Sequence, residues 1–242
     1  MLSKSQVKYI QSLGQKKFRD QEGLFIAEGP KIVNELLTEI PQLVKTVYGV
    51  KEWIDESRGL LIKTAFIEIS EAELERISQL SAPNKVLAVL YKIKDDEIIT
   101  PNNITLVLDN IQDPGNLGTI IRSADWFGVK QIVCSHNSAD MYNSKVIQAT
   151  MGSIARVKII YTDLATWLKQ QSVTIFAASL KGKDIRKMSK LTEGIIIIGN
   201  EAKGINPEVM QLAGEKITIP KPGKAESLNA AVATAIILSH IV

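Results

Sequence analysis

Hydrophobic and polar positions along the chain follow two successive patterns, and the first covers roughly ninety residues. Apolar residues at helical spacing predict helices over residues 3–13 and from Pro30 onward, where proline suits a first helical turn. Ser70 and Glu73 have the spacing of a capping box and predict a third helix. Apolar runs predict strands over residues 24–27, 43–50 and 85–91. The pattern therefore predicts a small α/β unit.

The second pattern consists of short runs rich in valine and isoleucine, with helical stretches between most of them. These runs cover residues 104–109, 131–134, 157–160, 173–178, 194–199 and 216–219. Near-continuous apolar strands that alternate with helices are typical of a parallel sheet covered on both faces. The chain ends in an apolar run, residues 228–242, which is shorter than the ~20 residues that a membrane span needs. We expect this run to be a helix buried against the core or a second subunit.

A charged segment that turns into a run of turn-forming residues separates the two patterns. It covers residues 96–103 and predicts a linker between a first domain, residues 1–95, and a second, residues 104–242. Ligands of parallel sheets bind beyond the carboxyl ends of the strands. We therefore expect the chemistry of the protein in the loops that follow the strands of the second domain.

The net charge of +3 among 242 residues is too small to indicate a nucleic-acid ligand by itself. The distribution of charge says more, because a cluster of basic residues precedes Asp20, the first acidic residue. Such a basic edge suits phosphate contact, but charge alone favours the simpler interpretation of a solvated helix face. The candidate RNA-binding residues in this cluster are Lys16, Lys17 and Arg19.

The single cysteine excludes a disulfide within the chain, and the positions of the two histidines disfavour a metal site. Cys134 has no partner in the chain, which favours a reducing compartment such as the cytoplasm. It follows two β-branched residues, so we expect a buried thiol in a strand. His136 and His240 are far apart and do not have the spacing of zinc ligands, so no metal is expected.

The first loop of interest follows the strand at residues 104–109. Residues 113–115 (Asp-Pro-Gly) predict a turn, and Asn116 is expected to be the N-cap of the next helix. Arg122 lies less than two turns into this helix. An arginine and a helix N-terminus that point at one space form a phosphate site; a capped helix with a surface arginine is the simpler alternative.

The second loop follows the strand at residues 194–199. Gly199 and Gly204 bracket polar residues there, and glycine permits a ligand to approach the backbone closely. Glu201 lies between them, and it is interpreted either as a functional carboxylate or as an acid at a helix start.

The third loop follows residues 216–219 and leads into the apolar C-terminal helix. Ser227 is expected to cap this helix. Asn229 needs hydrogen-bond partners if it is buried, or else makes a local capping interaction. No glycine fingerprint and no P-loop follows the strand at 104–109, which disfavours a dehydrogenase or a P-loop nucleotide hydrolase.

Together the three loops resemble the motifs of the SpoU (TrmH-type) branch of the SPOUT RNA methyltransferases. The first motif is similar to LDNIQDPGNLGTIIRSADWFGV, residues 108–129, and the second to IIIIGNEAKGI, residues 195–205. The third is similar to ITIPKPGKAESLNAAVATAI, residues 217–236. A further family segment resembles ATMGSIARV, residues 149–157, and the ribosomal-protein-like substrate-binding domain of the family resembles residues 16–37. Lys221 and Pro222 depart from the third motif, where the family has methionine and a small residue.

The resemblance implies an α/β fold in which a smaller ribosomal-protein-like α/β domain precedes a parallel-sheet domain tied in a trefoil knot. It implies a homodimer with the active site at the subunit interface. The implied reaction is metal-free methyl transfer from S-adenosylmethionine to a ribose 2′-hydroxyl of RNA. Large-subunit ribosomal RNA is the first expectation and transfer RNA the second. A non-catalytic RNA-binding protein that retains the fold is the alternative from another functional class.

Residue by residue, the resemblance assigns two sets of positions in the second domain. The catalytic positions are Asn116, Arg122, Glu201 and Asn229. The cofactor positions are Leu180 in an expected loop at 179–182, Gly199, Gly204, Ile219, Ser227 and Leu228. We interpret Arg122 as a group that binds RNA phosphate and stabilises the developing alkoxide, because a guanidinium holds its proton tightly; the role of base stays open. The two asparagines are expected to orient, and Glu201 to structure the site.

Overall fold

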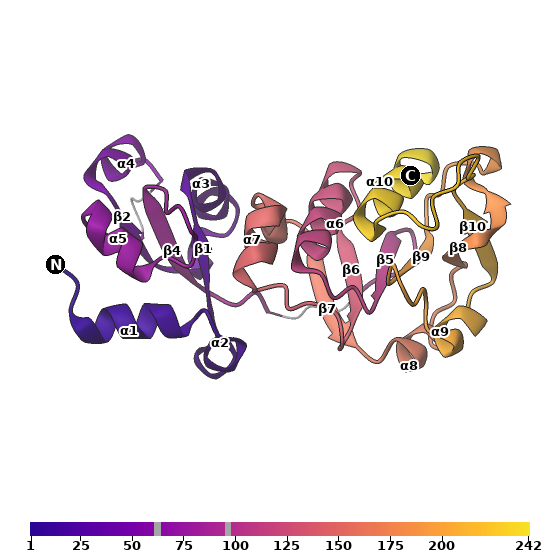
Figure 1. Ribbon diagram of the computed structural model, residues 1–242, viewed down its shortest axis with the longest axis horizontal. Helices are drawn as coiled ribbons and strands as arrows, with labels where there is room; N and C mark the ends of the chain where they lie inside the picture. Colours follow the sequence, from indigo (N-terminus) through magenta and orange to yellow (C-terminus); the bar gives the residue numbers. More distant parts are fainter. Residues whose placement is uncertain (61–63, 95–97) are drawn as a thin grey trace. The chain divides into compact units, whose positions relative to one another are not determined.

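The computed structural model describes residues 1–60, 64–94 and 98–242, and it divides into two compact units (Figure 1). The first unit comprises Met1–Lys94 and Tyr142–Ala155, and the second Asp95–Met141 and Arg156–Val242. Of the predicted linker, residues 96 and 97 lie outside the described residues, and the part that is described belongs to the second unit.

The first unit is a four-stranded sheet in the order β1-β4-β2-β3 with helices around it. Strand β4 pairs antiparallel with both β1 and β2, and β2 pairs parallel with β3. The strands are β1 (Leu24–Glu28), β2 (Val44–Gly49), β3 (Phe66–Glu68) and β4 (Val86–Tyr91). The helices are α1 (Lys4–Ser12), α2 (Lys16–Glu22), α3 (Pro30–Glu39), η1 (Pro41–Leu43), α4 (Lys51–Glu56), α5 (Glu71–Ile77), α7 (Ser144–Thr150) and η2 (Ser153–Ala155).

Local sequence signals account for the helix starts of this unit. The predicted capping box at Ser70 and Glu73 is confirmed at the start of α5, and Ser3 and Gln6 form a second one before α1. Each box satisfies two backbone N–H groups that a helix start otherwise leaves without a partner. Pro30 occupies the first turn of α3 as the pattern predicts.

The segment at residues 142–155 packs with the first unit although the sequence pattern places it in the second domain. The Tyr142 ring lies 4.8 Å from the Phe25 ring between centroids, and Val146 and Ile147 of α7 are buried. Gln148 also donates from Nε2 to the backbone carbonyl of Glu28 over 2.9 Å. Hydrophobic periodicity along the chain does not indicate which core a short helix joins, so this arrangement needs three-dimensional information.

The second unit is a six-stranded sheet in the order β10-β8-β9-β5-β6-β7, and every pairing in it is parallel. This confirms the predicted parallel-sheet α/β fold. The strands are β5 (Ile104–Asp109), β6 (Gln131–Ser135), β7 (Lys158–Thr162), β8 (Ile175–Asp184), β9 (Gly194–Gly199) and β10 (Glu215–Thr218). The helices are α6 (Pro114–Trp126), α8 (Leu164–Leu168), η3 (Ile185–Lys187), α9 (Pro207–Gln211) and α10 (Ala230–Ile241).

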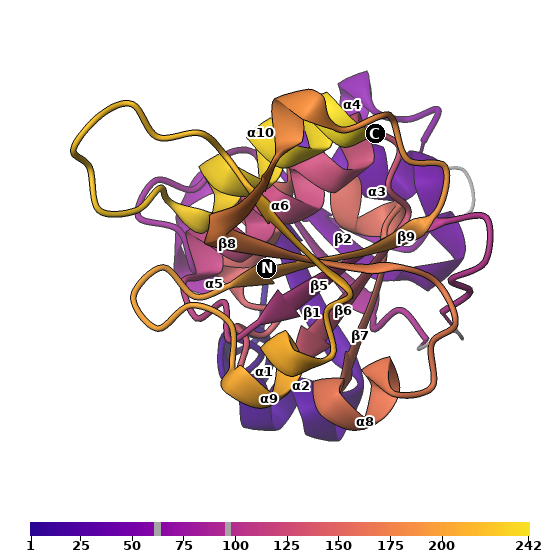
Figure 2. The ribbon, with the colours of Figure 1, turned by 90° about the vertical axis from the view of Figure 1, so that its right-hand side faces the viewer.

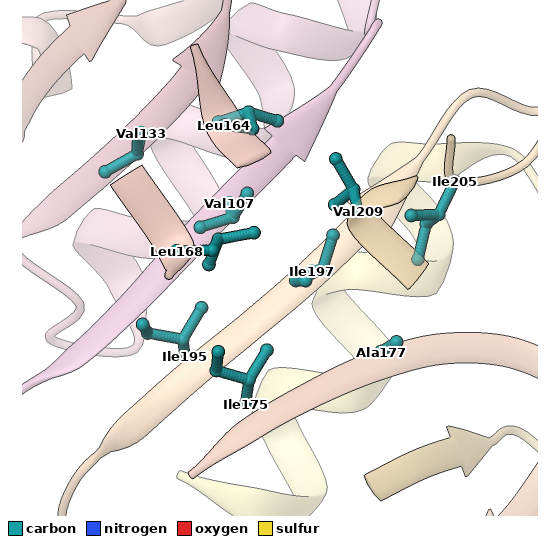
Figure 3. Packing of buried hydrophobic residues seen from close by; sticks show 10 residues of the cluster. All are labelled: Val107, Val133, Leu164, Leu168, Ile175, Ala177, Ile195, Ile197, Ile205 and Val209. Carbon is teal, nitrogen blue, oxygen red and sulfur yellow. The ribbon is translucent and has the colours of Figure 1, made fainter. Parts of the chain in front are cut away.

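Helices cover both faces of this sheet, with α6 and α10 on one face and α8 and α9 on the other (Figure 2). Alternate strand residues face each layer, because side chains of a strand point to opposite faces. The core under α8 and α9 is formed by Val107, Val133, Leu164, Leu168, Ile175, Ala177, Ile195, Ile197, Ile205 and Val209 (Figure 3). Cys134 lies in β6 and is fully buried, as predicted, and burial raises the pKa of its thiol.

Strand β8 is longer than the sequence pattern predicts. The residues expected to form a loop, 179–182, lie within this strand, and its pairing with β10 shifts register between Lys216 and Ile217. Gly182 allows the backbones of β8 and β10 to approach closely at this point, because an added Cβ would lie 2.5 Å from the carbonyl oxygen of Lys216. Among the helices of the described residues, none has both the length and the apolar character needed to cross a bilayer.

Candidate active site

The loops singled out in the sequence leave the same edge of the second sheet. Strands β5 and β9 are neighbours, and Asp109 at the end of one is in register with Gly199 at the end of the other. Figure 2 shows the connections after β9 and after β10 leaving this carboxyl edge, where α6 also begins. Parallel strands place their carboxyl ends at one edge, so loops that are far apart in sequence meet there.

The first loop positions Asn116 in the first turn of α6. The predicted N-cap is wrong: Asp113 is the N-cap, and its Oδ1 accepts from the backbone N–H of Asn116 over 2.7 Å. Pro114 occupies the first helical position, which moves the helix start towards the turn. Asn116 does not cap the helix, and its side-chain amide is therefore available for other partners.

Hydrogen bonds join the side chains of three loops into one cluster. The Asn116 amide donates from Nδ2 to Oε1 of Glu201 in the second loop. Its carbonyl Oδ1 accepts from Nδ2 of Asn229, in the third loop, over 2.7 Å. Asn116 thus uses its donor towards Glu201 and its acceptor towards Asn229, which also fixes which way its amide faces. The two partners lie 85 and 113 positions from Asn116 along the chain.

Asn229 closes the cluster by capping α10. Its Oδ1 accepts from the backbone N–H groups of Ala231 and Val232 over 2.9 and 3.2 Å, so the local capping interaction is confirmed. The expectation that Ser227 caps this helix is wrong, because the helix starts later and Ser227 is exposed. The Glu201 carboxylate accepts from the backbone N–H of Ala230 over 3.3 Å. A carboxylate at a helix N-terminus is stabilised by the helix dipole.

The second loop is a tight turn rather than a helix start. Asn200 and Gly204 form an isolated bridge, in which each backbone N–H donates to the other's carbonyl over 3.1 and 2.8 Å. Gly204 has a φ of 69°, and an added Cβ on Gly199 would lie 2.5 Å from the Gly204 carbonyl carbon. Glu201 therefore does not begin a helix of its own loop, and the helix start that its carboxylate contacts is that of α10. Both glycines are required by the shape of the loop that holds it.

Arg122 is exposed on α6, less than two turns beyond Asn116. Within the described part of the chain it forms no ion pair, whereas Asp125 in the next turn is held by Arg156 over 2.9 Å. Its guanidinium is thus free to bind a ligand, although no hydrogen bond connects it to the cluster of Asn116, Glu201 and Asn229.

The expected cofactor residues lie around the same edge. Leu180 is 69% exposed and lies in β8, between the two parts of this strand that pair with β10. Leu228 is 44% exposed and directly precedes Asn229. Ile219 is half-buried just after β10. Exposed apolar side chains and polar backbone at a sheet edge suit a ligand with an apolar ring and polar substituents.

The three basic residues of α2 differ in exposure. Lys16 and Lys17 are exposed, but Arg19 is 3% exposed and donates from NH1 to the carbonyls of Leu13 and Gly14 over 3.0 and 2.8 Å. The expectation that Arg19 contacts RNA does not hold, because its guanidinium is buried as a bridge between α1 and α2.

Sequence reasoning missed two polar residues, Asp109 and Asn200, whose hydrogen bonds hold the loops of the site in place. The buried Asp109 carboxylate accepts from the backbone N–H of Asn206 over 2.6 Å. Asn200 donates from Nδ2 to the carbonyl of Asn110 over 3.1 Å and accepts from the N–H groups of two following residues. A polar residue directly at the end of an apolar strand was the available signal, and it occurs at Asp109 and at Asn200.

Comparisons with known proteins agree with this arrangement. The model of the SpoU rRNA Methylase family matches residues 103–239, and that of the MRM3-like substrate binding domain matches residues 4–88. The chain is 29% identical to the 23S rRNA (guanosine(2553)-2′-O)-methyltransferase RlmP of Bacillus subtilis, over 97% of this chain and 95% of that protein.

Two solved structures are similar over nearly the whole chain. A TrmH-family protein from Porphyromonas gingivalis is 34% identical, with a TM-score of 0.89 over 99% of this chain and 98% of its own. An AdoMet-bound rRNA methyltransferase from Sinorhizobium meliloti is 30% identical, with a TM-score of 0.86 over 99% of this chain and 95% of its own.

Proposed function

Since the chain belongs to the SpoU rRNA Methylase family, we propose that it transfers the methyl group of S-adenosylmethionine to a ribose 2′-hydroxyl of ribosomal RNA. The observation that carries this proposal is the hydrogen-bonded cluster of Asn116, Glu201 and Asn229 at the carboxyl edge of the parallel sheet. The full-length similarity to a 23S rRNA 2′-O-methyltransferase supports ribosomal RNA as the substrate class, with transfer RNA as the second candidate.

The residues at the sheet edge fit S-adenosylmethionine. The exposed side chains of Leu180 and Leu228 offer apolar surface for an adenine ring, and the backbone of Gly199 and Ile219 lies at the ends of β9 and β10. Gly204 gives the loop after β9 its shape. The Ser227 hydroxyl is exposed in the same connection. When bound, this cofactor supplies a methyl group on a sulfonium cation, which needs only a positioned nucleophile. In the connection between β10 and α10, Pro222 restricts the backbone and Lys221 adds a positive charge.

Arg122 is proposed to bind the RNA phosphate and to stabilise negative charge that develops on the ribose oxygen. Its exposure and its freedom from ion pairs within the described residues support this role. Asn116 and Asn229 are proposed to orient the attacking group, and Glu201 to hold Asn116 and the start of α10. Positioning of this kind accounts for large parts of many enzymatic accelerations.

The first unit is proposed to bind RNA through the exposed Lys16 and Lys17, and the cytoplasm is the compartment we infer for the protein. We also propose that it forms a homodimer through α6 and α10, which pack against each other. These helices carry two exposed apolar side chains, Trp126 at 84% and Val232 at 49%. Sedimentation of the Trp126→Arg/Val232→Asp variant is expected to give a monomer. The trefoil knot that the family resemblance implies stays a prediction.

The proposed reaction is tested by methyl transfer from tritiated S-adenosylmethionine to ribosomal RNA purified from a strain that lacks the protein. We expect label in ribose, located at one nucleotide by 2′-O-methyl mapping. Arg122→Ala is expected to abolish transfer and to leave cofactor binding by calorimetry almost unchanged; Arg58→Ala, at an exposed arginine of the first unit, is the control. Cofactor binding without transfer to ribosomal RNA or transfer RNA by the wild-type protein would favour a non-catalytic RNA-binding protein.

A further inference from the structure

An aromatic and basic surface in the first unit takes part neither in the core nor in the proposed methyl-transfer site. It consists of Tyr9 in α1, Lys45 in β2 and Tyr91 at the end of β4, and we call it the tyrosine–lysine surface. The Nζ atom of Lys45 lies 5.8 Å from the centroid of the Tyr9 ring and 5.8 Å from that of the Tyr91 ring. Tyr9 is 36% exposed and Tyr91 46%, so part of each ring is open to a ligand.

Local structure holds these side chains in place. Lys45 lies where the pairing of β2 with β4 shifts register, between Val44 and Thr46, and such bulges redirect the side chain at that position. The Tyr9 hydroxyl donates to Oε2 of Glu22 over 3.0 Å. Burial, and then this hydrogen bond, raise the pKa of Tyr9 to about 12, and the hydrogen bond restrains the position of the ring.

The charges around the surface leave a cation available. Of the neighbouring carboxylates, Glu22 accepts from Tyr9, and Asp20 pairs with Lys92 over 2.5 Å. Lys45 forms no ion pair within the part of the chain that the structure describes. Its distance of 5.8 Å from each ring is close to the outer limit of about 6 Å for a cation–π contact, so neither ring is committed to it.

We propose that the tyrosine–lysine surface binds an unpaired nucleotide of the RNA, whose base stacks on a tyrosine ring while a phosphate pairs with Lys45. This inference rests on the proposed function in that its ligand is RNA. Sequence-tolerant binding of single strands combines these same elements, an aromatic face for the base and a cation for the backbone. A continuous duplex does not offer such a base, because its bases are stacked inside the helix. The surface therefore selects a loop, a bulge or an end.

The direct test is photo-crosslinking of the full-length protein to a short single-stranded oligouridylate that carries 5-iodouridine. Halogenated bases crosslink efficiently to aromatic side chains on which they stack, and mass spectrometry of the peptides identifies the residue. We expect the crosslink at Tyr9 or Tyr91. A crosslink confined to other residues would overturn the proposal.

Binding of the same oligouridylate, followed by fluorescence anisotropy, tests the energetic role of the rings. Tyr9→Leu/Tyr91→Leu is expected to weaken binding by about 5- to 100-fold, the range found when stacking side chains are removed. Tyr9→Phe/Tyr91→Phe keeps both rings and is expected to bind within about twofold of the wild type. The matched control is Phe66→Leu, because Phe66 is an equally exposed aromatic residue, 49%, on the same sheet.

A duplex RNA in the same assay separates stacking from general attraction. We expect the double leucine variant to bind the duplex as the wild type does. Wild-type affinity of that variant for the single strand, or an equal loss for both RNAs, would overturn the proposal.

The outcome is separable from that of the proposed function. An active methyltransferase whose double leucine variant keeps the wild-type KM for RNA would overturn the tyrosine–lysine surface alone. A wild-type protein that transfers no methyl group, yet shows the expected crosslink and loss of binding, would overturn the reaction alone.

Discussion

The side-chain amide of Asn229 donates to the side-chain carbonyl of Asn116 over 2.7 Å and so ties the start of α10 to the first turn of α6. The hydrogen-bond chain continues to the second loop, because the side-chain amide of Asn116 donates to Glu201. Each of the three side chains has a defined donor or acceptor role, and the backbone N–H groups at the start of α10 complete the cluster. The order of donors and acceptors makes the cluster sensitive to single-atom changes.

Asn116→Asp replaces the donor that faces Glu201 with an oxygen. Two carboxylates would then face each other, and repulsion would separate the loops by a fraction of an ångström or more. We expect kcat/KM for methyl transfer to fall by about 100-fold, because small displacements in a positioned site have effects of this size. Steady-state kinetics with tritiated cofactor measures it.

The double variant Asn116→Asp/Glu201→Gln supplies the control for this prediction. The new amide at position 201 can donate to the new carboxylate at position 116, which still accepts from Asn229. Part of the lost activity should therefore return. A double variant no more active than Asn116→Asp would show that the charge of Glu201, rather than its place in the cluster, is what the site needs.

Gly199→Ala tests the close approach between β9 and the loop that follows it. The added Cβ would lie 2.5 Å from the carbonyl carbon of Gly204 and from the backbone nitrogen of Ile205, and neither can swing aside as a side chain would. We expect a loss of roughly 1–3 kcal/mol in the free energy of unfolding, typical of overpacking, together with weaker binding of S-adenosylmethionine. Urea denaturation and calorimetry measure the two effects.

Gly214→Ala is the matched control in the same unit. An added Cβ there would meet the carbonyl oxygen of Ile175 at 3.8 Å, an ordinary contact. This variant should keep wild-type stability and cofactor affinity. Equal behaviour of the two alanine variants would remove the argument from close backbone approach.

The sequence predicts the strands of the second unit well because their signal is local. Buried parallel strands need apolar residues on both faces, and runs such as residues 194–199 meet this need within six positions. The loops are also predictable as a group, since the order of apolar strands and helices places all of them at one sheet edge.

The hydrogen-bond partners in the site are less predictable, because they depend on where each helix begins by one or two residues. Asn116 and Ser227 are both reasonable caps by residue type, yet Asp113 and Asn229 cap the helices. Several acceptable caps occur near each other, and tertiary contacts decide between them. Arg19 shows the same limit, since a basic residue beside two exposed lysines gives no local sign of burial.

Lys16→Glu/Lys17→Glu tests the basic end of α2 as a phosphate-binding element. Both side chains are exposed, so the change should leave the fold intact. We expect weaker binding to ribosomal RNA and a smaller slope of log K against log salt, by about 0.7–0.9 for each RNA phosphate that the variant no longer neutralises. Filter binding at several salt concentrations gives both quantities.

The control for this pair is Lys31→Glu/Lys51→Glu, which changes the net charge of the same unit by the same amount on α3 and α4. If this variant showed the same decrease in affinity and salt dependence as Lys16→Glu/Lys17→Glu, the effect would come from total charge and not from α2. Arg19→Ala should lower stability, because two backbone carbonyls lose their donor.

Glu28→Gln tests a buried carboxyl of the first unit. Glu28 is 3% exposed and accepts from the Ser78 hydroxyl and from the backbone N–H of Gln79 over 2.9 Å. Burial raises its pKa above the ordinary value of 4.5 and outweighs these hydrogen bonds. Its contribution to stability is therefore full below about pH 4.5 and is lost as pH rises through the folded pKa. Relative to Glu28→Gln, the wild type should lose stability to urea as pH rises above about 4.5 and through the raised pKa of Glu28.

Glu73→Gln should show the opposite pH dependence of stability relative to the wild type, so it serves as a comparison for Glu28→Gln. Backbone N–H groups of Ser70 and Leu2 lower the pKa of Glu73 below its ordinary value of 4.5, the Ser70 group having the larger effect. The wild type is thus favoured over Glu73→Gln above about pH 4.5 and loses this advantage as pH falls through the lowered pKa. Urea midpoints measured from about pH 3 to pH 8 should separate the two variants at opposite ends of the range. Parallel curves for both would show that neither carboxyl titrates differently in the folded and unfolded chains.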